Sequence, residues 1–565
     1  MLNEQKFPQS DAVDIMLFSE GTFPYIRGGV SAWLAQLMQG LPQFTFGVCF
    51  IGAQDNIDGQ PLKISYKFPS NLKHLEVHYL FNDDASPSVQ KRKGDKEGFE
   101  SIEKLYKGFS SDNFSMPEEI QNISFYNDKV TFEDFLYSQR AWNFIDKTYS
   151  KNCPDVPFID YFWTLRNIHK PIWILSEIVQ NLPKTKVFHA PSTGYAGFMA
   201  TLASYNTNRP YILTEHGIYT RERKIDMFSA DWIEFKKPSL LQQPEEYNYI
   251  KKMWVNFFDR IGRFCYDRSN YTLSLFNGAK NIQISYGADE NKCYVIPNGV
   301  DVAGLEATMV NRLPIPKPIV TLIGRVVPIK DIKTFIRAIK IASLTIPDIE
   351  GWIVGPVEED MEYFEECQQM AISLNLKQTK QIFQDNKSVI SPEELEAHSD
   401  KIKFFGFSNI KDILPKSALQ TLSSISEGMP LVILEGFAAG VPCVATDVGS
   451  CRDLIDGAID DEDKAIGMAG AVVSIANPDA LAKEYVKFLT FENGLWEKAQ
   501  EAGLTRVKKY YEQTMFLQEY ATIYEEALTR DWKQLSEIIY PYYAPKPLPF
   551  PKQPQRRFEV VQWQA

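Results

Sequence analysis

The stretch "SEGMPLVILEGFAAGVPCVATDVGS" (Ser426–Ser450) predicts a loop, a short apolar helix and a buried strand in succession. Pro430 suits the first turn of a helix, because the N–H that proline lacks has no partner there. We expect the helix to cover residues 431–439, and Gly440 before Val-Pro to end it. This alternation of helix and apolar strand is typical of an α/β protein.

Two glutamates accompany this helix, Glu427 in the loop before it and Glu435 within it. A carboxylate in an apolar helix needs a partner, because burying its charge costs several kcal/mol. Glu435 would lie roughly 6–8 Å deeper than the helix start at 1.5 Å per residue, which is comparable to the distance from a diphosphate to its ribose. The alternative is a glutamate that caps the helix or pairs with a neighbouring cation. The loop and first turn that would present backbone groups to the phosphates comprise Gly428, Met429, Pro430, Leu431 and Val432.

Strand-like apolar runs alternate with helical patterns on both sides of a proline-containing segment at 309–318. The pattern predicts two doubly wound α/β domains with a hinge near residue 310. The expected strands lie within 13–20, 44–52, 74–81, 186–190, 211–217 and 291–301, and then within 319–328, 350–356, 401–407, 419–426 and 442–450.

We expect an N-terminal domain at 1–308, a C-terminal domain at 309–525, and a return segment with a proline-rich tail at 526–565. A polar, helical insertion is predicted at about 84–150, either as a lid or partner surface or, as we favour, as a solvated face. The tail should run extended along a surface, because its prolines exclude helix and central strand.

The composition and charge of the chain argue against several classes of protein. The 565 residues are 44% hydrophobic and 23% charged, and the net charge of −12 argues against an extended nucleic-acid surface. The N-terminus lacks the pattern of a signal peptide, and no apolar run approaches the ~18 residues of a membrane span. The seven cysteines are scattered and form no CxxC pair, which favours free thiols in a reducing cytoplasm over zinc or disulfides.

Two further groups could hold phosphate. Arg325 follows an expected strand and Lys330 begins the next helix, so both should lie at the carboxyl edge of the second sheet, where open α/β folds bind ligands. Together they suit a diphosphate, although a surface ion pair with a nearby carboxylate is an equal alternative. Gly28 and Gly29 open a helix after the first strand and could let backbone approach an anion. No G-x-G-x-x-G follows any expected strand, which argues against nicotinamide or flavin.

Taken together, the E-x7-E pair, Gly28-Gly29, "GRVVPIK" (324–330) and "PNGVD" (297–301) resemble the GT4 family of retaining glycosyltransferases. That resemblance implies the GT-B fold, with two Rossmann-like domains that face each other across a donor-binding cleft. The first half, with "HAPSTGYAGFMA" (189–200) and "TEHGIYTRER" (214–223), looks like the members that act in the bacterial cytoplasm in Pel exopolysaccharide synthesis.

The resemblance also implies roles for matching positions. Arg325 and Lys330 would neutralise the donor diphosphate, and Gly28 and Gly29 would line the phosphates from the opposite domain. In addition, it implies that Glu435 holds the ribose, that Glu427 binds sugar hydroxyls near the anomeric carbon, and that His216 contacts the donor sugar. Asp331 departs from the family, in which glycine commonly follows the lysine.

These observations predict an enzyme that moves a hexose from UDP-glucose or a UDP-N-acetylhexosamine to a growing polysaccharide, without cofactor or metal. The Asp461-Glu-Asp463 sequence spells a metal-binding D-x-D, but its polar surroundings favour a loop. Expected partners are the UDP-sugar donor, the polysaccharide acceptor and an inner-membrane synthase or export complex. A sugar-nucleotide-binding scaffold subunit and a phosphorylase are the alternatives.

Overall fold

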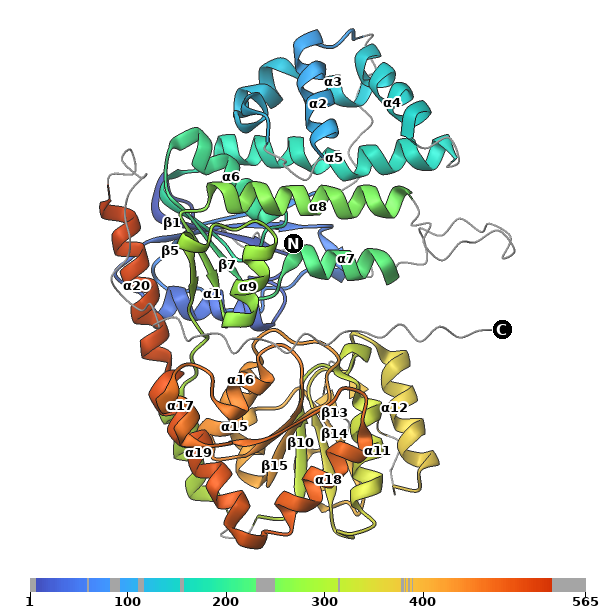
Figure 1. Ribbon diagram of the computed structural model, residues 1–565, viewed down its shortest axis with the longest axis vertical. Coiled ribbons are helices and arrows are strands. Elements are labelled where there is room, and N and C mark those ends of the chain that lie inside the picture. Colours follow the sequence, from blue (N-terminus) through green and yellow to red (C-terminus); the bar gives the residue numbers. More distant parts are fainter. Residues whose placement is uncertain are drawn as a thin grey trace, which may run out of the picture.

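A computed structural model of the chain describes residues 7–530, except 58–59, 82–91, 110–115, 153–156, 230–248, 313–315, 377–380, 382, 385–386 and 389. It contains two sheets of largely parallel strands, each covered by helices, and these form the two stacked parts of Figure 1. The predicted pair of doubly wound α/β domains is therefore confirmed. The proline-rich tail lies outside the described residues.

The first sheet has seven strands in the order β5-β2-β1-β6-β7-β8-β9, and every pairing is parallel. Parallel strands buried on both faces require continuous apolar runs, as in β2, where every residue is buried. The strands are β1 (Ala12–Glu20), β2 (Phe46–Gly52), β5 (Leu72–Tyr79), β6 (Lys184–Ala190), β7 (Tyr211–Glu215), β8 (Tyr271–Ser274) and β9 (Cys293–Val295).

Helices cover both faces of this sheet. The helices α1 (Gly29–Gly40) and α20 (Gln513–Thr529) contribute to the apolar core on one face. On the other face the core includes α5 (Phe158–Asn181), α6 (Tyr195–Thr207) and α8 (Tyr249–Arg268). Figure 1 shows α20 running beside the first domain although it follows the second in sequence. The return to the first domain thus begins near residue 513, earlier than the expected 526.

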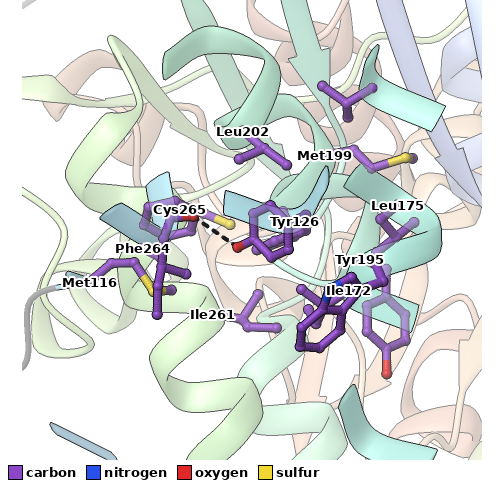
Figure 2. Close-up of a cluster of buried hydrophobic side chains, with 14 of the residues drawn as sticks. Met116, Tyr126, Ile172, Leu175, Tyr195, Met199, Leu202, Ile261, Phe264 and Cys265 are labelled. Carbon is purple, nitrogen blue, oxygen red and sulfur yellow. Dashed lines mark hydrogen bonds between the residues drawn. The ribbon is translucent and has the colours of Figure 1, made fainter. Parts of the chain in front are cut away.

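The predicted insertion is helical, with α2 (Lys96–Phe109), α3 (Phe132–Tyr137) and α4 (Gln139–Asn152) above α5 in Figure 1. It is more than a solvated face, because its apolar side chains join the core. Figure 2 shows Met116 and Tyr126 of this segment among Ile172 of α5 and Ile261 of α8, and all four are buried. The insertion is therefore anchored to the sheet-covering helices.

The second sheet has eight strands in the order β12-β13-β14-β11-β10-β15-β16-β17. They are β10 (Ile319–Ile323), β11 (Glu350–Val354), β12 (Phe383–Gln384), β13 (Lys387–Ser388), β14 (Ile402–Gly406), β15 (Leu419–Leu422), β16 (Cys443–Thr446) and β17 (Gly470–Val473). The core on one face includes α11 (Ile332–Ala342), α12 (Met361–Ser373) and α18 (Pro478–Leu489). The opposite face carries α15 (Leu431–Ala438) and α16 (Cys451–Asp456), while α19 (Leu495–Tyr510) contributes to both cores.

The chain passes between the two domains twice, near Val300 and near Gln513, and these two segments lie side by side. The Val300 N–H donates to the Tyr511 carbonyl at 2.9 Å, and the Gln513 N–H donates to the Val300 carbonyl at 3.0 Å. Val300 and Leu305 already belong to the core of the second domain. The first crossing therefore lies near residue 300 rather than at the expected boundary of 308, because the chain packs into the second domain before it reaches the prolines.

Candidate active site

The Gly-Met-Pro loop leads from β15 into α15. Pro430 (φ −76°, ψ 105°) stands immediately before Leu431, so the helix begins at the expected residue. Gly440 adopts φ +68°, and its N–H donates to the Phe437 carbonyl at 2.9 Å. The left-handed residue after the helix explains why glycine ends it, as predicted.

The carboxylate of Glu427 connects two loops of the second domain. It accepts from Lys330 Nζ and from Ser424 Oγ, each at 2.5 Å. The Ser423 hydroxyl donates to the Lys330 carbonyl at 2.8 Å, which ties the loop after β15 to the loop after β10. Lys330 and Glu427, proposed separately from the sequence, therefore meet at one edge of the sheet.

The first domain meets this loop at His216. A Cβ at Gly428 would lie 2.6 Å from the His216 carbonyl oxygen, closer than real Cβ contacts allow. The loop is held from its other side, because the Ser450 N–H donates to the Gly428 carbonyl at 2.9 Å. Gly449, at φ +55°, packs on the backbone of Glu427. Glycine at 428 thus permits contact between the two domains.

His216 has an unused ring nitrogen at this junction. Its Nε2 is buried and has no hydrogen-bond partner within the described part of the chain. Its imidazole packs edge-on against Trp33 of α1, with ring centroids 4.7 Å apart. Burial lowers the pKa of His216 to about 3, so the ring is neutral at physiological pH. A neutral imidazole with a free nitrogen can accept from, or donate to, a sugar hydroxyl.

Glu435 likewise lacks a partner. Its half-buried side chain makes no hydrogen bond or ion pair to any residue that the structure describes. Burial raises the pKa of Glu435 to about 7, because nothing nearby compensates the loss of water. The ion-paired glutamate that the sequence left open as the alternative is therefore found at Glu427, which pairs with Lys330, and not at Glu435.

Arg325 does not join this cluster in the described contacts. It is exposed, and its Nη1 lies 2.5 Å from Glu359 Oε1. The surface ion pair that the sequence left open is thus formed by Arg325. A role for Arg325 in binding the donor remains a prediction.

Gly28, which precedes α1, and Gly29, the first residue of α1, face open space. A Cβ at Gly28 or Gly29 would meet no atom within 4 Å, and Gly28 has an extended backbone that any residue adopts. Ser31 fixes the turn, since its hydroxyl accepts from the Gly28 N–H at 2.8 Å and bonds Tyr66 Oη at 2.8 Å. The fold itself supplies no reason for glycine at either position.

The D-x-D sequence has a structural explanation. Asp463 is buried and pairs with the buried Arg506 at 2.6 Å, and it also accepts from the N–H groups of Ala458 and Ile459. A carboxylate occupied in this way is a structural anchor for α19. Sequence reasoning missed Ser424 and Trp33, because neither a hydroxyl in a loop nor a tryptophan in an apolar stripe is distinctive.

Comparisons with known proteins cover both domains. Residues 13–291 match the model of a domain of unknown function, DUF3492, and residues 317–490 match that of glycosyl transferases group 1. The N-acetyl-alpha-D-glucosaminyl L-malate synthase of Bacillus anthracis is 28% identical over 136 residues, which are 23% of this chain and 32% of that protein. An Escherichia coli UDP-Gal:alpha-D-GlcNAc-diphosphoundecaprenol alpha-1,3-galactosyltransferase is 29% identical over 186 residues, 30% of this chain and 41% of that protein. The chain thus spans less than half the length of these curated relatives.

Solved structures share the fold. Anabaena Alr3699/HepE in complex with UDP and glucose aligns with 91% of this chain and 99% of its own, at a TM-score of 0.50 and 14% identity. Sucrose-phosphate synthase from Thermosynechococcus elongatus covers 91% of this chain and 98% of its own, at a TM-score of 0.51 and 13% identity. No helix in the described ranges is both long and apolar enough to cross a membrane. Residues 13–291 are thus similar to DUF3492 domains and residues 317–490 to group 1 glycosyltransferases, and the two parts together have the GT-B fold.

Proposed function

We propose that the protein is a retaining glycosyltransferase that moves a hexose from a UDP-sugar to a polysaccharide. The observation that supports this proposal is the junction of the Gly428 loop with the backbone of His216, a residue whose imidazole Nε2 has no hydrogen-bond partner among the described residues. Buried polar groups without partners are rare in folded proteins, so an unsatisfied group at a domain junction favours a ligand there. Two similar proteins support a UDP-sugar donor: the Escherichia coli galactosyltransferase uses UDP-Gal, and Anabaena Alr3699/HepE has a crystal structure in complex with UDP-glucose.

In this proposal the donor lies between the domains. The N-terminal end of α15 and the Gly428 loop receive the diphosphate, with Lys330 as the cation beside them. Glu435 accepts from the ribose hydroxyls, and that bonding offsets the cost of burying its carboxylate. Glu427 and His216 contact the hexose, and Gly28 and Gly29 let the backbone of the first domain approach the phosphates.

The chemistry needs no protein nucleophile. In the mechanism that we propose, the anomeric carbon leaves the diphosphate oxygen through an oxocarbenium-like state. The acceptor hydroxyl attacks from the same face, and its proton passes to a phosphate oxygen of the departing UDP. The protein positions both substrates and stabilises the charge that develops on the diphosphate. Asp463 of the D-x-D sequence pairs with Arg506, and the proposed mechanism assigns it no role.

The proposed acceptor polysaccharide is inferred from the resemblance of the first domain to enzymes of Pel exopolysaccharide synthesis. We propose a PelF-like enzyme that extends the Pel exopolysaccharide in the bacterial cytoplasm, beside an inner-membrane synthase or export complex. UDP-glucose and a UDP-N-acetylhexosamine are the donors to test first.

UDP release tests the proposal. Purified protein with UDP-glucose, UDP-N-acetylglucosamine and UDP-N-acetylgalactosamine, each with and without oligosaccharide acceptor, should release UDP faster when acceptor is present. NMR of the product should show the anomeric configuration of the donor. A protein that binds a UDP-sugar without acceptor-dependent release is instead the scaffold subunit. Release that requires orthophosphate indicates the phosphorylase.

A further inference from the structure

Arg27 is a cation that lies between the two domains. It directly precedes Gly28 and Gly29, and its guanidinium carbon lies 5.5 Å from the ring centroid of Phe407 in the second domain. Within its own domain, Nη2 donates to the Ser65 carbonyl at 3.0 Å, and the guanidinium lies 6.0 Å from the Tyr66 ring centroid. The side chain is exposed, yet these contacts hold it at one place across the domain junction.

Phe407 belongs to the ligand-binding edge of the second sheet. It follows β14, whose last residue, Gly406, accepts from the Gly355 N–H at 2.8 Å. Gly355, at φ +153°, in turn packs on the carbonyl of Gly324, in the loop that carries Arg325. The loops after β10, β11 and β14 are therefore contiguous. Arg27 reaches this edge from the opposite domain.

Arg27 differs from the two predicted phosphate cations in its charge partners. Lys330 is paired with Glu427 and Arg325 with Glu359, so each is already beside a carboxylate. Among the residues with described positions, Arg27 has no carboxylate within ion-pair distance, and its one hydrogen bond leaves most of its five N–H donors free. A guanidinium of this kind is suited to bidentate binding of phosphate.

We propose that Arg27 binds the donor pyrophosphate from the N-terminal domain and leaves the ring of Phe407 when the donor enters. This inference rests on the proposed function, since it assumes a nucleoside diphosphate between the domains. It assigns the positive charge facing the donor to a residue from each domain, Arg27 and Lys330, rather than to the second domain alone. Donor binding would thereby join the domains through the phosphate.

Calorimetric titration with UDP and with uridine distinguishes a contact of Arg27 with the phosphates from a contact with the nucleoside. Arg27→Gln should weaken UDP binding at least tenfold and change uridine binding less than twofold, and Arg27→Lys should retain part of the affinity for UDP. Arg209→Gln, which alters an exposed arginine in the turn after α6, should bind UDP like wild type. The unfolding temperatures of the free variants should match, because Arg27 is exposed.

Wild-type affinity for UDP in Arg27→Gln would overturn the inference, and so would an equal loss for UDP and uridine. Failure of wild type to bind any nucleoside diphosphate would instead contradict the proposed function. The two failures are therefore distinguishable in one set of titrations.

Discussion

A half-buried carboxyl without a partner among the described residues makes Glu435 both a cost to stability and a candidate ligand. Its pKa of about 7 in the folded chain exceeds the ordinary 4.5, so the group favours folding at low pH and loses that contribution as pH rises from 4.5 through 7. Glu435→Gln should therefore raise the free energy of unfolding at pH 8 by about 1–3 kcal/mol. It should also weaken UDP-sugar binding at least tenfold, because an amide accepts the ribose hydroxyls less strongly than a carboxylate does.

Denaturant unfolding and calorimetric titration of the same variant check both effects. The exposed Glu497→Gln of α19 serves as control and should change neither. A Glu435→Gln variant that is destabilised, or that binds the donor normally, contradicts the ribose assignment.

A substitution at Gly28 tests whether a ligand occupies the empty space beside this residue. Gly28→Ala adds a methyl group that meets nothing within 4 Å, so the unfolding temperature should stay within about 1 °C. Its UDP affinity should fall several-fold, because the methyl group occupies the approach of the phosphates. Unchanged affinity in a thermal-shift titration would show that no ligand comes close to this turn.

Lys330 provides a test of turnover. Lys330→Ala removes the charge next to Glu427 and should lower the transfer rate at least tenfold, as one preorganised group at a developing charge is worth roughly 3–4 kcal/mol. Steady-state UDP release measures this, with Arg325→Ala in parallel to show whether Arg325 leaves Glu359 to serve the donor. A near-normal rate in a folded Lys330→Ala variant rejects its assignment.

At the scale of elements, the two segments that cross between the domains are packed against each other near Val300 and Gln513. A Cβ at Gly299 would lie 2.7 Å from the Cα of Gln513, so only glycine permits the present contact. Gly299→Ala should separate the segments and cost about 1–3 kcal/mol in the free energy of unfolding. Calorimetry gives that cost. Gly494→Ala serves as a control without crowding, because its methyl group would meet only Glu497 Oε2, at the ordinary contact distance of 3.9 Å.

Some strands and helices could be predicted from the sequence, and others could not. The strands β1 and β2 are predictable from their long apolar runs, because parallel strands are buried on both faces. The sequence did not predict the strands β8 and β17, because an apolar run of only four residues carries little signal. The start and the end of α15 were predictable, because Pro430 precedes the helix and Gly440 follows it. The contacts of Gly428 with His216, and of Lys330 with Glu427, join positions 212 and 97 residues apart, a proximity that only the fold creates.

For the whole molecule, buried histidines predict acid sensitivity. Burial lowers the pKa of His169 to about 4 and those of His189 and His216 to about 3, against an ordinary 6.5. Each therefore contributes stability that is complete above pH 6.5 and is lost as pH falls toward 3 or 4, up to about 2 kcal/mol per histidine at pH 5. Urea midpoints should drop steeply between pH 7.5 and 5. His169→Gln should reduce that drop, because it removes one of the three buried imidazoles that must become charged in acid.

The central claim is that both domains build one donor site, and a crystal structure with bound UDP-sugar tests it most directly. We predict the diphosphate at the Gly428 loop and the start of α15, the ribose hydroxyls within hydrogen-bond distance of Glu435, and the hexose beside His216 Nε2. A UDP-sugar bound elsewhere, or one whose ribose lies away from Glu435, would contradict this account.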